Sequence, residues 1–136
     1  MTEAEAITAL TAYISEATSS YIDFIGVISA FLIMSYFAAH KLSNILMYVV
    51  LVLFTIVAGS LSFTLYLINN DLDSLYRYII EQKYSGTYDL PWFGMNPEWA
   101  SRGLTMLETL SAIGGYFGSV FFFYYQRKHG ADESGT

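Results

Sequence analysis

The sequence predicts an all-α integral membrane protein with three transmembrane helices, an N-terminal amphipathic helix and a short interfacial helix in the second loop. Of its 136 residues, 54% are hydrophobic and 13% are charged, whereas a soluble domain carries about 25% charged residues. Three stretches contain no charged residue: 24–39, 45–68 and 109–126. Because about 20 apolar residues cross a bilayer core of roughly 30 Å, these stretches predict spans at 21–40, 44–69 and 103–126 of a single membrane domain.

The first predicted element is the amphipathic helix at 2–18. Thr2 and Glu5 have the spacing of a capping box, in which each side chain accepts a backbone N–H bond from the other residue. One helical stripe is formed by Ile7, Leu10, Ile14 and Ala17. Ser20 and Asp23 repeat the capping spacing just before the first apolar stretch. We therefore expect a new helix, the first span, to begin there.

A short polar connection follows the first span at His40 and Lys41, and Ser43 can cap the second span. The first two spans therefore form a predicted antiparallel hairpin. The second span is expected to end near 69–71. The stripe beyond it predicts a short interfacial helix or a continuation of the second span, and the region 71–101 is expected to lie outside the membrane. The members of this stripe are Leu72, Leu75, Tyr76, Ile79 and Ile80.

Turn-forming and aromatic residues fill the segment 84–99, which we interpret as an ordered loop. Three of its aromatic residues suit the headgroup level of a bilayer: Trp92, Phe93 and Trp99. Asn96, Pro97 and Glu98 are typical of a helix start, with a capping amide, a proline in the first turn and an acid beside it. The third helix is therefore expected to begin at Pro97. The tail at 127–136 is polar and is expected to fray.

The basic residues give a weak orientation signal. Three of them adjoin the ends of the predicted spans on one side: Lys41, Arg127 and Lys128. The other side holds Arg77, Lys83 and Arg102, and of these only Arg102 adjoins a span. Since basic residues next to spans favour the cytoplasmic side, we expect the N-terminus outside and the C-terminus in the cytoplasm. The expected location is the inner membrane of a bacterium.

Two acidic residues lie inside the predicted first and third spans. Along its helix, Asp23 lies roughly 27 Å from Lys41, and Glu108 lies roughly 28 Å from Arg127. Both carboxylates are therefore expected at the outer edge of the bilayer. In one hypothesis they meet in a hydrated vestibule and form an ion or proton site. In the other, which we favour, Asp23 caps its helix and Glu108 bonds a serine, threonine, tyrosine or Arg102.

Small residues recur at helical spacing in all three predicted spans. Such residues let helix backbones approach closely in lipid. We therefore expect a compact bundle that packs with itself or with larger subunits. The predicted packing seam consists of Gly26, Ala30, Ala58, Gly59, Ser62, Ser111, Gly114, Gly115 and Gly118.

Several classes of function find no support in the sequence. The chain has no cysteine, which excludes cysteine-ligated zinc and iron–sulfur clusters, and its net charge of −6 argues against a nucleic-acid surface. No catalytic set, metal-ligand cluster or mid-span histidine stands out, so we expect no enzyme, metal or cofactor.

The expected function is helix packing in the lipid bilayer, as a homo-oligomer or as an accessory or structural subunit of a larger membrane complex. The alternative is a small ion channel or holin-like pore-former, whose acidic outer mouth is formed by Asp23 and Glu108.

Overall fold

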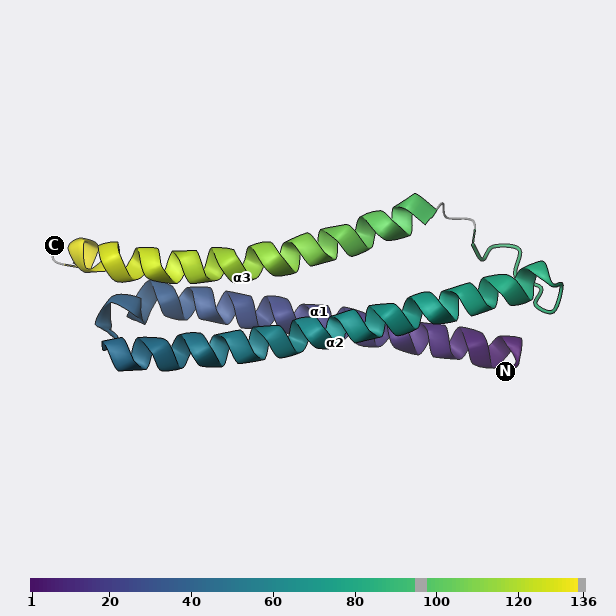
Figure 1. Cartoon of the computed structure of the whole chain (residues 1–136), viewed down its shortest axis with the longest axis horizontal. Coiled ribbons are helices and arrows are strands. Elements are labelled where there is room, and N and C mark those ends of the chain that lie inside the picture. Colours follow the sequence, from purple (N-terminus) through teal and green to yellow (C-terminus); the bar gives the residue numbers. More distant parts are fainter. Residues whose placement is uncertain (95–97, 135–136) are drawn as a thin grey trace.

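The computed structural model describes residues 1–94 and 98–134, and over these residues the chain is entirely helical apart from turns and one loop. Its elements are α1 (Glu3–Ala38), the 3-10 turn η1 (Ala39–Lys41), α2 (Asn44–Tyr84) and α3 (Glu98–Ser134). The three long helices lie lengthwise beside one another, with α1 and α3 running in the same direction and α2 in the opposite one (Figure 1). Each contains a segment long and apolar enough to cross a membrane. The predicted hairpin of the first two helices is confirmed.

The N-terminus of α1 has the predicted capping box. The Thr2 N–H donates to Glu5 Oε2 at 2.7 Å, and the Glu5 N–H donates to Thr2 Oγ1 at 3.3 Å. These bonds satisfy backbone donors that have no partner within the helix. The bond from the Thr2 N–H holds the pKa of the Glu5 carboxyl below its ordinary value because it favours the ionised form.

The predicted helix start at Ser20 and Asp23 is wrong, because α1 is one helix of 36 residues. No proline or glycine separates the amphipathic segment from the apolar one. Thr18 also lies within the helix, where its hydroxyl donates to the Ile14 carbonyl at 2.9 Å. Serine and threonine can make such bonds in mid-helix, so a capping pattern there does not by itself start a new element.

Helix α2 begins as predicted and ends later than expected. Ser43 caps it by accepting a bond from the Leu46 N–H at 3.3 Å. The helix passes through 69–71 without a break and continues to Tyr84, so the continuation is confirmed and a separate interfacial helix is wrong. Gly86, with φ 76°, then supplies the left-handed residue that a helix C-terminus commonly requires.

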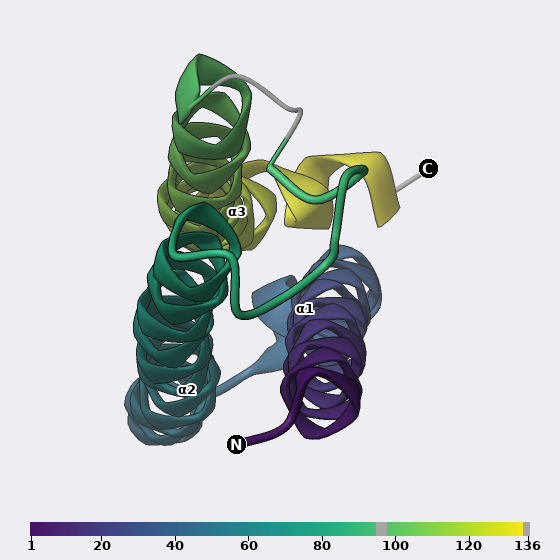
Figure 2. The same ribbon diagram turned by 90° about the vertical axis from the view of Figure 1, so that its right-hand side faces the viewer.

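The start of α3 predicted at Asn96 and Pro97 lies outside the described residues. From Glu98 the helix continues to Ser134, so the prediction of a frayed tail is wrong for 127–134, and 135–136 lie outside the described residues. Arg127 binds the turn between the other two helices, and this contact holds the polar end of α3 in place. The last turns of α3 leave the long axis of the bundle (Figure 2).

Two separate apolar clusters stabilise the bundle. The larger cluster joins all three helices through stacked rings: Phe31 and Phe54 have ring centroids 3.8 Å apart, and Phe54 stacks on Tyr116 at 5.6 Å. Phe123 of α3 is fully buried in the same cluster. Aromatic contacts of this kind stabilise beyond the apolar area that they bury.

The smaller cluster builds a head from the start of α1, the end of α2 and the loop 85–94. Its buried members are Ala6, Ile79, Tyr88, Leu90 and Phe93. Phe93 is therefore a core residue of the head, packed on Tyr76. The headgroup level of Trp92, Phe93 and Trp99 stays a prediction, and the side chain of Trp99 lies outside the described residues. The Tyr88 hydroxyl donates to the Met1 carbonyl at 2.7 Å, which ties the N-terminus under the loop.

Candidate functional site

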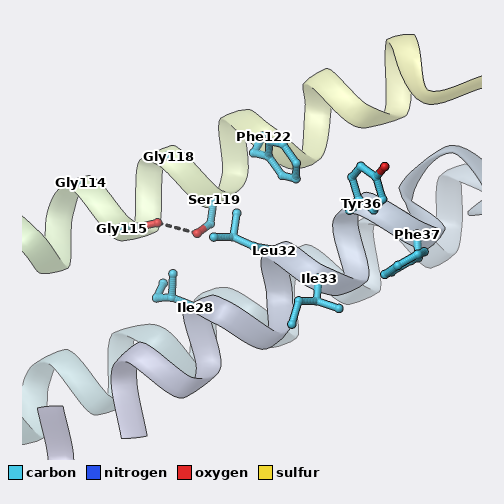
Figure 3. Close-up of a pocket in the computed structure, with 10 residues that line it drawn as sticks. All are labelled: Ile28, Leu32, Ile33, Tyr36, Phe37, Gly114, Gly115, Gly118, Ser119 and Phe122. Atoms are coloured by element: carbon cyan, nitrogen blue, oxygen red, sulfur yellow. Dashed lines mark hydrogen bonds between the residues drawn. The ribbon is translucent and has the colours of Figure 1, made fainter. Parts of the chain in front are cut away.

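An apolar groove lies between α1 and α3. The two helices approach closely at Gly115, where an added Cβ would lie 3.8 Å from the side chains of Ile28 and Phe24. Beside this contact the surface opens into a groove of about 640 Å³ (Figure 3). The residues that line it are Ile28, Leu32, Ile33, Tyr36, Phe37, Gly114, Gly115, Gly118, Ser119 and Phe122.

The groove offers little to a polar ligand. None of its lining residues is charged. The hydroxyl of Ser119 donates to the Gly115 carbonyl at 2.6 Å, so its one proton is already used. Tyr36 supplies the only other hydroxyl of the lining, near the end where α1 meets η1. The groove therefore suits an apolar group.

The predicted packing residues divide into two sets. Three are used within the chain: Ala58 is buried, Ser62 is half-buried, and Gly115 contacts α1. The other six are exposed on the chain, and a Cβ added at any of the four glycines among them would meet no atom within 4 Å. These six are Gly26, Ala30, Gly59, Ser111, Gly114 and Gly118. The fold therefore leaves most of the predicted seam uncovered.

Glu108 pairs with α2. The Asn69 side-chain amide donates to Glu108 Oε2 at 3.1 Å, and Glu108 is half-buried there. Asn69 is not one of the partner types that we expected. Asp23 is exposed on α1 and makes no hydrogen bond or ion pair with a described residue. A common site for the two carboxylates therefore stays a prediction.

A second polar contact joins α2 and α3 further along the bundle. The Thr55 hydroxyl lies 2.8 Å from the Tyr116 hydroxyl, and Thr55 also donates to the Leu51 carbonyl. Thr55 and Asn69 lie on one face of α2 because they are 14 residues apart, close to four helical turns. These two contacts hold α3 against α2, whereas glycine packing holds it against α1.

The opposite end of the bundle from the head is held by Arg127. Its guanidinium donates to the Leu42 carbonyl at 3.1 Å and also binds Asn44 Oδ1. Close by, a Cβ added at Gly130 would lie 3.4 Å from His40 Nδ1, which is buried and has no hydrogen-bond partner among the described residues. Glycine thus lets α3 lie against the turn between α1 and α2.

Some of these residues had no signal in the sequence. The α1 wall of the groove reads as an ordinary apolar helix, and nothing marked Asn69 as the partner of Glu108. The three glycines of the groove were predicted as packing residues, and they could have located it. Within the described residues, no group of three or more histidines or acids could hold a metal ion.

The chain matches no family model, no curated protein and no solved structure.

Proposed function

We propose that this chain is a non-catalytic membrane subunit whose three helices cross the bilayer and whose α1 packs against a transmembrane helix of a partner. The contact surface is the α1 face of Asp23, Gly26 and Ala30. The partner is a second copy or a larger membrane subunit. The head lies outside the membrane, and the end that holds Arg127 faces the cytoplasm.

The exposed apolar surface supports the membrane location. Ile45 is 80% exposed, Phe121 is 72% exposed and Phe37 is 66% exposed, and each belongs to a different long helix. Soluble proteins rarely expose contiguous apolar patches of more than a few hundred Å². A bilayer removes this cost because lipid tails are as apolar as the side chains.

The observation that carries the packing proposal is the open space at Gly26. An added Cβ there would meet no atom within 4 Å, and Ala30 is exposed one turn further along. Two small residues four apart form the spacing that lets helix backbones approach closely in lipid. Since α1 uses neither residue to pack on α2 or α3, the surface remains available to another helix.

Asp23 lies on the same face and supports the same proposal. The carboxylate is exposed and unpaired among the described residues, at the outer edge of the proposed span. Acidic side chains within spans usually pair with another group. A partner helix that covers Gly26 would bring a hydrogen-bond donor to this carboxylate.

Leucine substitutions at two glycines, one on the proposed contact surface and one outside it, test the proposal. Gly26→Leu fills the open space and should remove the chain from its native complex, measured by native electrophoresis of membranes solubilised in mild detergent. Gly59→Leu is the matched control, because Gly59 is equally open but is followed one turn later by the bulky Phe63. The proposal is wrong if wild type runs as a lone monomer, or if Gly26→Leu assembles as wild type does.

A further inference from the structure

We infer that the groove between α1 and α3 binds one acyl chain of an anionic phospholipid, taken from the leaflet beside Lys41 and Lys128. This inference requires the membrane location but does not depend on the packing face at Gly26. It assigns an occupant to a surface that the chain itself leaves open.

The groove has the depth of a single leaflet. At about 1.5 Å per residue, its lining residues lie roughly 6–20 Å from Lys41 along α1 and roughly 8–20 Å from Arg127 along α3. Half of a bilayer core is about 15 Å thick. The groove therefore runs from just below the headgroups to just past the midplane, which is the range that one acyl chain occupies.

The groove ends near the midplane because the neighbours of α3 change along the bundle. Toward the head, α2 crosses α1 and comes to lie next to α3 (Figures 1 and 2), where Asn69 binds Glu108. The groove therefore ends near the midplane, at about the depth that one acyl chain reaches.

The lining fits the chemistry of an acyl chain. Gly114 and Gly118 have no side chains and leave space in the groove, and the other lining residues are mostly aliphatic or aromatic. The hydroxyl of Ser119 is bonded to its own helix. An apolar chain beside Gly114 and Gly118 would therefore not bury an unpaired Ser119 hydroxyl, and the Tyr36 hydroxyl lies at the end of the groove nearest η1.

Two lysines near the end of the groove that is closest to η1 favour an anionic lipid headgroup. Lys41 of η1 lies four residues beyond the groove residue Phe37 of α1, and Lys128 lies less than two turns beyond Phe122 on a neighbouring face of α3. Both lysines are exposed and have no hydrogen bond or ion pair with a described residue, whereas Arg127 is bonded to the turn. Basic residues between transmembrane helices recognise anionic headgroups, at about fivefold in affinity per lysine near the surface.

Native mass spectrometry of the detergent-purified chain tests the inference by titration with phosphatidylglycerol and phosphatidylcholine of identical acyl chains. Wild type should bind one phosphatidylglycerol more tightly than phosphatidylcholine, by about 25-fold if both lysines contribute. Lys41→Gln combined with Lys128→Gln should remove this preference and leave phosphatidylcholine binding unchanged.

Gly118→Leu fills the groove and should lower the binding of both lipids at least tenfold, and Gly59→Leu, on α2, should change neither. Ile33→Trp is a second way to fill the groove from its α1 wall, and helical circular dichroism reports whether each variant folds. Equal binding of the two lipids by wild type would overturn the inference, as would full binding by folded Gly118→Leu and Ile33→Trp. A lipid-free dimer that Gly118→Leu dissociates would assign the groove to a second copy instead.

Discussion

Asn69 of α2 and Glu108 of α3 form a hydrogen bond of 3.1 Å at the end of the bundle where α2 comes to lie next to α3 (Figures 1 and 2). The bond joins two helices that run in opposite directions, and side chains lean toward the N-terminus of their own helix. The pair therefore fixes how α2 and α3 are aligned along the bundle.

Removal of the amide donor should destabilise the bundle more than neutralisation of the carboxylate. Asn69→Leu leaves Glu108 without its partner and should cost about 1–2 kcal/mol of unfolding free energy. Glu108→Gln should cost less, because its amide oxygen can still accept the bond. Thermal unfolding in detergent, followed by circular dichroism, measures both. Unfolding of Asn69→Leu at the wild-type temperature would contradict this role of the pair.

The packing function predicts that the two acids carry no ion flux. Liposomes that contain the wild-type chain should leak no more cation than empty ones, and Asp23→Asn combined with Glu108→Gln should leave that leak unchanged. Cation flux in wild type that the double variant abolishes would instead establish the channel alternative. A fluorescent indicator trapped inside the liposomes reports both results.

The stacked rings of Phe31 and Phe54 should contribute most to the stability of the helical bundle. Phe31 is only 6% exposed, and Phe31→Ala should cost about 3–5 kcal/mol. Phe37→Ala is the matched control on the same helix, because Phe37 is largely exposed and its loss removes little packing within the chain. Denaturation of each variant in mixed detergent gives the two costs, and equal costs would show that the stack is not the centre of the core.

The head should loosen at high pH as Tyr88 ionises. Burial raises the pKa of Tyr88 above its ordinary value of 10.0, and a hydrogen bond with Tyr78 raises it further. Because the folded pKa lies above the unfolded one, this contribution to stability is complete below pH 10 and is lost as the pH rises through the folded value. The protection of the loop 85–94 against amide exchange, relative to the intrinsic base-catalysed rate at each pH, should therefore fall above pH 10.

Tyr88→Phe provides the control for this pH effect. It lacks both the ionising hydroxyl and the bond to the Met1 carbonyl, so the protection of its loop should be lower at neutral pH and should change less above pH 10. Protection that falls equally in wild type and Tyr88→Phe would assign the pH effect to another group.

The sequence predicted the three long helices better than it predicted where they begin and end. Apolar run length identified the three long helices, and the caps at Thr2 and Ser43 were correct because each is an extended residue directly before a helix. The pattern at Ser20 failed because this residue lies inside a helix that runs unbroken from Glu3 to Ala38. A capping pattern alone does not distinguish a helix start from a position inside a helix.

Only the α3 side of the groove could be predicted from the sequence. Glycines four apart in 114–118 indicated close packing, but the α1 wall of the groove depends on where α1 crosses α2, which no local pattern encodes. The pairing of Glu108 with Asn69 depends on the same crossing. Long-range geometry of this kind arises from the packing of the aromatic cluster and becomes visible only in the assembled bundle.

Crosslinking from Ala30 tests the packing function most directly. The chain contains no cysteine, so Ala30→Cys can carry a single short photoreactive label in native membranes. We predict a covalent adduct whose mass corresponds to two copies or to one copy plus a transmembrane subunit, and the additional Gly26→Leu substitution should abolish it. The same label at Ile56→Cys, on the exposed surface of α2, should react with lipid alone. Labelling of lipid alone from Ala30 would contradict the proposed function.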